Sequence, residues 1–451
     1  MELLYSIFRG IIGIAFLIGI AFLFSNNKKK INWRLVLSGL GIQLVFAILL
    51  IKGSELGSIF SPLAWPKEIF KWLSSRFVLL LNFTTEGAVF VFGDLAKAPG
   101  SENSIGFFFA FQVLPTIIFF ASIMSVLYYL GIMQKIVQAM AWVMSKIMGT
   151  SGAESLSCTA NIFVGQTEAP LMIKPFLKGM TQSEILTIMT GGMATIAGGV
   201  MAAYIQLLSQ SFAESMSMSI NEAQLMFATH LLGASVMAAP AALLLSKIIF
   251  PETLTPETQG TVKVKVEKNS SNVLEAAATG ASDGLSLALN VGAMLIAFIA
   301  LIALVNYSLE SLGDLIGLNN ILLAEYGKPL NLQLVLGLIL QFVAIAIGVP
   351  FDSAVQFGSL IGSKIVLNEF VAYFEMSNLI AAKELLNDKA IVMATYALCG
   401  FANFSSIAIQ IGGLSPLAPE RKSDFAKLGL KAVLGGTLAT LMTATLAGIL
   451  Y

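Results

Sequence analysis

Charge is scarce in this sequence. Only 12% of its 451 residues are Asp, Glu, Lys or Arg, whereas soluble globular domains carry roughly 25%. So few charges cannot cover the water-facing surface of a chain this long, which argues against a soluble multi-domain enzyme. Because 26 basic and 26 acidic residues balance to zero, we expect no basic surface for nucleic acid either.

Histidine and cysteine are scarcer still. The single histidine, His230, excludes a cluster of histidine metal ligands. Cys158 and Cys399 both lie in apolar tracts, so no disulfide framework is indicated. With these groups missing we expect a protein that is not an enzyme and has no cofactor.

Long apolar runs, in contrast, are abundant. Hydrophobic residues make up 57% of the chain, and the mean hydropathy is +0.84. A membrane-spanning helix needs about 20 mostly apolar residues. The tracts that qualify are 9–25, 34–51, 106–130, 183–208, 222–249, 284–308, 389–412 and 426–450. Segment 52–105 carries basic residues together with Trp65 and Trp72, and part of it is expected to lie as a helix at the membrane interface.

Basic residues set the expected orientation. They gather in the loops 26–34, 247–268 and 413–431, and basic loops stay in the cytoplasm. Eight spans with both termini outside the cytoplasm put all three loops on the cytoplasmic side. The sequence therefore predicts a multi-pass protein of the inner membrane with that orientation.

Two further apolar tracts, about 150–180 and 350–388, are each interrupted by a polar cluster. The interrupting residues are Gln166, Thr167 and Glu168 in the first, and Asn368 and Glu369 in the second. The arms on either side, about 12–17 residues, are too short to cross the membrane as helix, so we expect two re-entrant hairpins. A carboxylate at that depth marks a functional site. The alternative is that each Glu sits at a helix end and reaches the headgroups.

Each hairpin is followed by a span with its own polar break. The break residues are Thr195, Gly198 and Gly199 in the first half, and Asn403, Ser405 and Ser406 in the second. The first hairpin would start from the cytoplasm and the second from outside, which makes an inverted repeat. Matching breaks in such repeats indicate a binding site at the membrane midplane. For the glycines, close packing of helices is an equal alternative.

The predicted fold is an all-α polytopic membrane protein: eight transmembrane helices, two re-entrant helical hairpins in an inverted repeat, and interfacial helices.

The polar clusters offer amides, hydroxyls and carboxylates, without Lys or Arg. A ligand held by phosphate or carboxylate would call for those basic residues. The set suits a neutral ligand, since a carboxylate accepts sugar hydroxyls and amides read the edge of a base. Backbone carbonyls freed at the breaks, with Asn and Thr oxygens, suit a hard cation such as sodium.

Three segments carry a family resemblance: NIFVGQTEAPLMIKP, LNEFVAY and GFANFSSIAIQIGG. They resemble, in order, the signature segments of the concentrative nucleoside transporters in their bacterial, sodium-coupled form. The resemblance extends from about residue 84 to the end. It implies a homotrimer in which a transport domain moves against a scaffold.

We accordingly expect 1–147 to be mainly scaffold, with the first three spans and the interfacial helices. Segment 148–250 is the first transport half, with hairpin 1 and spans 4 and 5. Segment 251–349 holds a cytoplasmic linker, the sixth span (scaffold) and an interfacial helix, and 350–451 is the second transport half, with hairpin 2 and spans 7 and 8.

The resemblance also implies residue roles. The nucleobase would contact Gln166, Thr167, Glu168 and Val200, and the ribose would contact Glu369, Asn403 and Ser406, with Phe401 close by. Sodium would be bound by Asn161, Thr195 and the backbone carbonyls of Val164 and Ile196. Some members have Ser at the position of Thr195, which keeps the hydroxyl. Gly165 resembles the small residue of broadly selective members.

The expected function is therefore import of nucleosides, driven by a sodium gradient, with an elevator-like movement. Uridine and other pyrimidine nucleosides are the expected substrates, and the small Gly165 extends the range to purines such as adenosine. Besides the nucleoside, the expected partners are membrane lipid and two further copies of the chain, with no nucleic acid. The alternatives are a proton-coupled nucleoside symporter and a passive channel for small neutral solutes.

Overall fold

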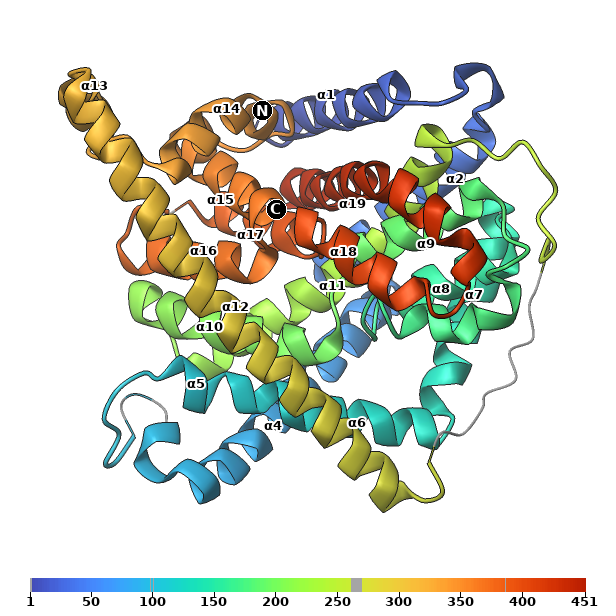
Figure 1. Ribbon diagram of the computed structural model, residues 1–451, viewed down its shortest axis with the longest axis horizontal. Helices are drawn as coiled ribbons and strands as arrows, with labels where there is room; N and C mark the ends of the chain where they lie inside the picture. Colours follow the sequence, from blue (N-terminus) through green and yellow to red (C-terminus); the bar gives the residue numbers. More distant parts are fainter. Residues whose placement is uncertain (1, 98, 100, 261–269, 386) are drawn as a thin grey trace.

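The computed structural model describes residues 2–97, 99, 101–260, 270–385 and 387–451, and every named element in those ranges is a helix (Figure 1). The all-α prediction is confirmed. The α-helices are α1 (Glu2–Leu23), α2 (Trp33–Ile51), α3 (Gly53–Ile59), α4 (Trp65–Phe92), α5 (Phe109–Gln112), α6 (Leu114–Tyr129), α7 (Ile132–Met148), α8 (Gly152–Ala160), α9 (Gln182–Ala194), α10 (Gly198–Met216), α11 (Ile220–Ile249), α12 (Val273–Leu315), α13 (Leu318–Tyr326), α14 (Leu332–Ala346), α15 (Ala354–Val366), α16 (Glu369–Ala381), α17 (Asp388–Leu398), α18 (Phe404–Leu414) and α19 (Lys422–Leu450). The 3-10 helices are η1 (Lys28–Lys30), η2 (Ser61–Ala64), η3 (Gly93–Ala96), η4 (Ala169–Phe176), η5 (Phe351–Ser353) and η6 (Pro419–Arg421).

Eight helical stretches of the described chain are long and apolar enough to cross a membrane. The number matches the prediction, but the eight stretches differ. Ser61–Ala96, which contains α4, is among them, although part of it was expected at the interface. Its basic residues and tryptophans lie before Phe77, and an apolar run follows. Conversely, the expected span 389–412 is divided into two short helices, α17 and α18. Of the loops behind the orientation argument, Lys263, Lys265 and Lys268 lie outside the described residues.

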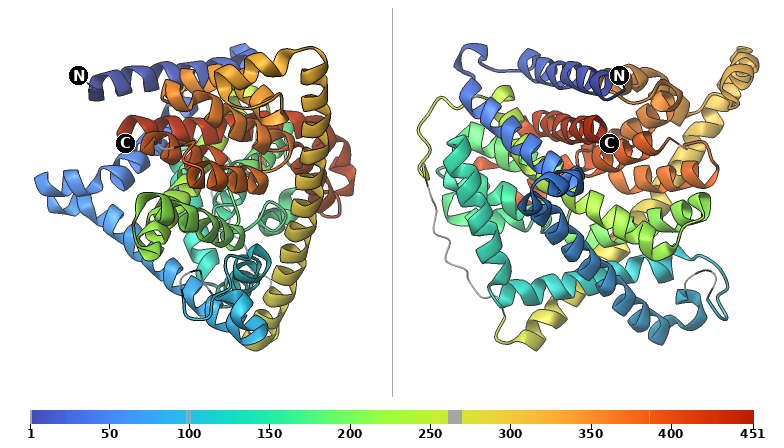
Figure 2. Two further views of the ribbon diagram at one scale, coloured as in Figure 1. Left: turned by 90° about the vertical axis from the view of Figure 1, so that its left-hand side faces the viewer. Right: turned by 180° about the vertical axis from the view of Figure 1, so that it is seen from behind.

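The helices form a buried centre between two exposed sides. Nearly all of α9 is buried, together with most of α10, α11 and α19. The 43-residue α12 crosses the face of the molecule diagonally in Figure 1 and packs along α6. Figure 2 shows α4 and α12 along two outer edges, converging toward α5 and α6. Because both helices keep much of their apolar surface exposed, these edges suit lipid or another apolar partner.

The two interrupted tracts form two helical hairpins. In hairpin 1, α8 contacts η4, and the non-helical residues 161–168 form the tip. Its arms have nine and eight residues, fewer than the 12–17 expected, because Pro170 and Pro175 keep the second arm in a short 3-10 helix. In hairpin 2, α15 and α16 have 13 residues each and meet at Leu367 and Asn368. Its arm lengths agree with the prediction.

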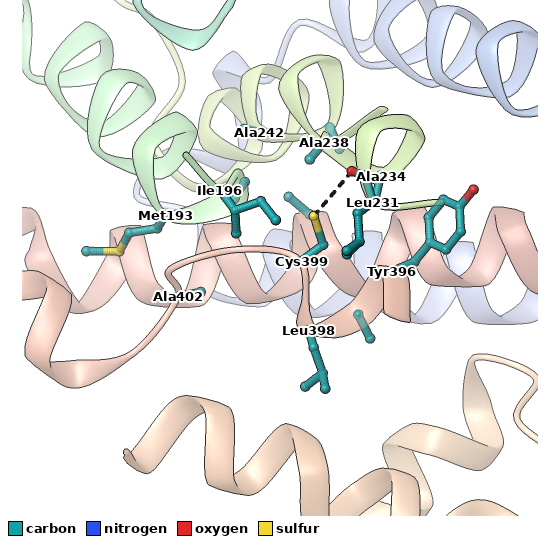
Figure 3. Packing of buried hydrophobic residues seen from close by; sticks show 14 of the residues in the cluster. Met193, Ile196, Leu231, Ala234, Ala238, Ala242, Tyr396, Leu398, Cys399 and Ala402 are labelled. Atoms are coloured by element: carbon teal, nitrogen blue, oxygen red, sulfur yellow. Dashed lines mark hydrogen bonds between the residues drawn. The ribbon is translucent and has the colours of Figure 1, made fainter. Parts of the chain in front are cut away.

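The span after each hairpin is broken where the polar residues predict it. The first break, 195–197, separates α9 from α10, and the second, 399–403, separates α17 from α18. The second break lies against the last turn of α9: a Cβ on Gly400 would lie 2.8 Å from the Met193 carbonyl oxygen, so only glycine fits there. Figure 3 shows both breaks against the alanine-rich face of α11, where the Cys399 thiol contacts the Leu231 carbonyl at 3.7 Å. Small residues thus let four helix ends meet at one point.

Candidate functional site

One cavity of about 1290 Å³ lies where the hairpin tips and the helix breaks converge. The eight predicted substrate residues all line it, although they come from four separate stretches of chain. They are Gln166, Thr167, Glu168, Val200, Glu369, Phe401, Asn403 and Ser406. Lys174 and Asp283 also line the cavity, so its described lining includes a basic side chain that the hairpin-tip clusters did not include.

Glu369 is held from two sides. Its oxygen Oε1 accepts a 2.8 Å hydrogen bond from the Tyr204 hydroxyl, and Oε2 accepts a 3.0 Å bond from the Asn403 amide. It is also the first residue of α16, which Asn368 caps, so the positive helix end faces the carboxylate. These contacts offset the cost of burying a side chain that is 6% exposed. Since each carboxylate oxygen has two acceptor positions, Glu369 can still accept ligand hydroxyls.

Asn403 orients its own amide by capping α18. Its oxygen Oδ1 accepts hydrogen bonds from the Ser406 backbone N–H at 2.8 Å and from the Ser405 hydroxyl at 2.7 Å. The amide nitrogen must then face the other way, where it donates to Glu369. The break at 399–403 therefore does two things: it starts a helix at the cavity and aims a donor at the carboxylate.

The tip of hairpin 1 lies along one face of α18. The Gln166 side-chain nitrogen donates to the Ser406 hydroxyl at 3.2 Å, and its oxygen accepts from the Gln410 amide at 3.0 Å. One turn further, a Cβ on Gly413 would lie 2.7 Å from the Thr167 methyl group. Positions 406, 410 and 413 share a helical face. This face thus carries the contact between the two halves of the chain.

Apolar and acidic groups complete the wall. Val200 is buried, Phe401 is half-buried, and both present flat or branched apolar surface to the cavity. The Glu168 side chain is exposed, and its carboxylate lies directly over Gly165, where a Cβ would overlap it. The site therefore combines two carboxylates, amides, hydroxyls and apolar contact surfaces within one cavity.

The four predicted sodium ligands lie at the tip of hairpin 1 and the first break. A 3.2 Å hydrogen bond from the Gly198 N–H to the Phe163 carbonyl joins these two segments. Asn161, Thr195 and Ile196 are buried, and Val164 lines the cavity. The Asn161 nitrogen donates to the Ser157 carbonyl at 3.0 Å, while its oxygen Oδ1 is buried with no hydrogen-bond partner among the described residues.

The donor set at this point fits a monovalent hard cation. The Ser157 hydroxyl is likewise buried and without a hydrogen-bond partner in the described part of the chain. The Thr195 hydroxyl donates to the Gly191 carbonyl at 3.0 Å, so its oxygen lone pairs are available for an ion. Neutral carbonyl, amide and hydroxyl oxygens are the ligands that hard cations prefer.

Sequence reasoning missed two residues of this site. Tyr204 supports Glu369, and Gln410 supports Gln166. Each follows a predicted residue by four positions, Tyr204 after Val200 and Gln410 after Ser406, and therefore lies on the same helical face. Searching that face for further polar side chains would have found both.

The architecture is that of a membrane transport protein: two halves, each with a hairpin and a broken helix, share one polar cavity at their contact. Three family models match the chain. Residues 12–95 match the Na+ dependent nucleoside transporter N-terminus, 110–211 match nucleoside recognition, and 230–448 match the Na+ dependent nucleoside transporter C-terminus. The chain belongs to this family, the concentrative nucleoside transporters, and is a transporter rather than an enzyme.

Individual relatives agree. The chain is 40% identical to nucleoside permease NupC of Helicobacter pylori, with 99% of this chain and 98% of the permease covered. It is 42% identical to sodium/nucleoside cotransporter 1 of Rattus norvegicus, covering 97% of this chain but only 63% of that protein. The solved structure of CNTnw in an inward-facing substrate-bound state matches with a TM-score of 0.84 at 38% identity, covering 98% of this chain and 99% of CNTnw.

Proposed function

We propose that this protein imports nucleosides and that an inward sodium gradient drives the import. The observation that carries the proposal is the cavity between the two halves, lined by all eight predicted substrate residues. Uridine and other pyrimidine nucleosides are the proposed substrates. Adenosine is a further one, because Gly165 adds no side chain to the cavity wall.

The proposed roles follow the chemistry of each wall. Glu369, Asn403 and Ser406 hold the ribose, because a carboxylate with acceptor positions to spare pairs with sugar hydroxyls. Gln166, Thr167 and Glu168 read the polar edge of the base and Val200 contacts its flat face, while Phe401 lies close to the ribose. The lining residues come from both halves of the chain, which supports a ligand held between the two.

Sodium is proposed at Asn161, Thr195 and the carbonyls of Val164 and Ile196. The supporting observation is the Asn161 side-chain oxygen, buried without a hydrogen-bond partner among the described residues. Leaving such an oxygen unpaired is costly, and a bound cation removes that cost. Because Gln166 follows Val164 by two positions in the same tip, sodium binding would order the residues that read the base. We propose that this is how the ion and the nucleoside are coupled.

The proposed transport movement is elevator-like. Segments 148–250 and 350–451 would move together against a scaffold built from 1–147 and 251–349. Residues such as Leu289, Ile296 and Leu304 keep α12 apolar and exposed, which suits packing against lipid or against other copies in a trimer. We place the protein in the inner membrane with both termini outside the cytoplasm, from the basic loops.

Uptake of tritiated uridine into proteoliposomes tests the proposal. Accumulation above the outside concentration is expected under an inward sodium gradient and not with potassium in its place. Equal uptake in potassium, driven instead by a pH gradient, would identify the proton-coupled alternative. Flux that only equalises the two concentrations would identify a passive channel, and no nucleoside uptake under any gradient would contradict the function itself.

A further inference from the structure

Gln410 stands directly behind Gln166, outside the cavity lining, and is 1% exposed. Its amide nitrogen donates two hydrogen bonds, one to the Met189 backbone carbonyl at 2.9 Å and one to the Gln166 side-chain oxygen at 3.0 Å. One fixed acceptor from α9 and one side chain from the tip of hairpin 1 therefore meet at a single amide.

These contacts determine which way each amide faces. A backbone carbonyl can only accept, so the Met189 carbonyl requires the nitrogen of Gln410 on its side. That nitrogen can only donate, so Gln166 must turn its oxygen toward Gln410. The nitrogen of Gln166 then faces Ser406 and the cavity, where it donates to the Ser406 hydroxyl at 3.2 Å. The backbone of α9 thus fixes the orientation of the Gln410 amide, and Gln410 in turn fixes that of the Gln166 amide at the cavity wall.

The fold keeps space for this arrangement. A Cβ on Gly192 of α9 would lie 2.8 Å from the Gln410 nitrogen and 2.9 Å from the Gln166 Cβ. Any larger residue at Gly192 would push the two amides apart. Three elements therefore converge to hold one side-chain orientation: α9, α18 and the hairpin 1 tip.

We propose that Gln410 is a positioning residue that makes Gln166 present an N–H donor, and not its carbonyl oxygen, to the nucleobase. An amide nitrogen has two N–H groups, and Ser406 accepts from one of them. We propose further that the other N–H faces position 4 of a pyrimidine base. Uracil has an acceptor carbonyl oxygen at that position and cytosine has a donor amine, so uracil is preferred. This inference rests on the proposed function, because it presupposes a nucleoside in the cavity.

Competition for uptake into proteoliposomes under an inward sodium gradient tests the inference, with unlabelled uridine or cytidine competing against tritiated uridine. For the wild-type chain cytidine should compete about fivefold less well, the worth of one neutral hydrogen bond. Gln410→Met keeps the buried volume but frees the Gln166 amide to turn, so the ratio should fall to about one. An unchanged ratio in Gln410→Met, or a wild-type ratio of one, would overturn the inference.

Gln43→Met is the matched control. Gln43 is fully buried on α2, and its amide donates to the Thr443 hydroxyl at 2.9 Å, away from the cavity lining. Its loss should leave the uridine-to-cytidine ratio at the wild-type value. If the ratio fell equally in this variant, a non-specific disturbance of the packing by loss of a buried amide would explain the result, and the positioning role would be wrong.

A second variant keeps the inference testable if Gln410→Met does not fold. Gln166→Glu still accepts from Gln410 but offers the base an acceptor, so cytidine should become the better competitor. Retained preference for uridine would overturn the inference. Should the wild-type chain transport no nucleoside at all, the proposed function fails, and this result is distinct from transport without base preference.

Discussion

The Tyr204 hydroxyl donates a 2.8 Å hydrogen bond to the Glu369 carboxylate across 165 residues of sequence. Tyr204 belongs to the broken span of the first half, and Glu369 begins the second arm of hairpin 2. Both side chains are buried. The first half therefore fixes the carboxylate that we assign to the ribose, and the ribose site depends on both halves of the chain.

Tyr204→Phe should weaken ribose recognition without disturbing the packing. The ring keeps its contacts with the rings of Phe370 and Tyr373, whose centroids lie 5.0 and 4.4 Å away, and only the donor to Glu369 is lost. Hydrogen bonds to charged groups contribute about 1.5–3 kcal/mol, so the KM for uridine should rise roughly tenfold or more. Competition by 2′,3′-dideoxyuridine, which lacks the hydroxyls, should change little.

Tyr373→Phe provides the control. The Tyr373 hydroxyl is equally buried but donates to the Thr395 carbonyl at 2.8 Å and not to Glu369. This variant loses one buried hydrogen bond of similar length. If it raised the KM for uridine as much as Tyr204→Phe does, the effect would be one of packing and not of the carboxylate.

Glu369→Gln should abolish efficient uridine uptake. Tyr204 and Asn403 each donate to a different oxygen of Glu369. In glutamine one of these oxygens becomes an NH2 group, which cannot accept from Tyr204 or Asn403 or from a ribose hydroxyl. We expect a loss of about 100-fold in kcat/KM for uridine, measured as initial uptake rates at several uridine concentrations. Wild-type uptake in this variant would remove Glu369 from the ribose site.

The polar interruptions in apolar runs were the part of the site that could be predicted. They mark residues such as Glu168, Glu369 and Asn403, because polar groups at membrane depth are costly unless they have a role. The positions of the two helix breaks followed in the same way. Hydrogen bonds between residues far apart in the sequence could not be predicted. The four-residue spacing marks Tyr204 and Gln410 as candidate site residues, but which side chain each one supports depends on how α10, α16 and α18 pack.

Membrane placement shows a second limit. The composition of 52–105 as a whole does not reveal the apolar run of α4, because basic residues and tryptophans of the segment cluster before Phe77. The short arms of hairpin 1 were overestimated because Pro175 lies inside the second arm. In both cases the order of residues within the segment mattered more than its composition.

Gly165→Ala should narrow the range of nucleosides. A Cβ at this position overlaps the Glu168 carboxylate, so that side chain must move into the space beside the base. Because purines are larger than pyrimidines, adenosine uptake should fall more than uridine uptake, by about tenfold against about threefold. The measurement is the ratio of adenosine to uridine uptake rates in proteoliposomes.

Gly199→Ala is the matched control for that variant. Gly199 lines the same cavity, but its Cβ would meet its nearest neighbour, the Ile117 carbonyl oxygen, at an ordinary 3.5 Å. The adenosine-to-uridine ratio should stay within about twofold of wild type. A similar drop in both variants would show that any added methyl group narrows the range, independently of Glu168.

Thr195→Val should uncouple transport from sodium. Valine keeps the shape of threonine but removes the hydroxyl oxygen that we assign to the ion, whereas Thr195→Ser keeps that oxygen. We expect the sodium stimulation of uridine uptake to disappear in the first variant and to persist in the second. Equal sodium stimulation in both variants would exclude the hydroxyl as a ligand.

Equilibrium binding of uridine to the purified chain, with sodium or with potassium at the same ionic strength, tests the central claim most directly. If sodium orders the hairpin 1 tip, it should raise the affinity for uridine, and uridine should raise the affinity for sodium by the same factor. Thr195→Val should abolish both effects, while Thr195→Ser should keep both. Equal uridine affinity in sodium and potassium would contradict the account, because the ion and the nucleoside would then bind independently.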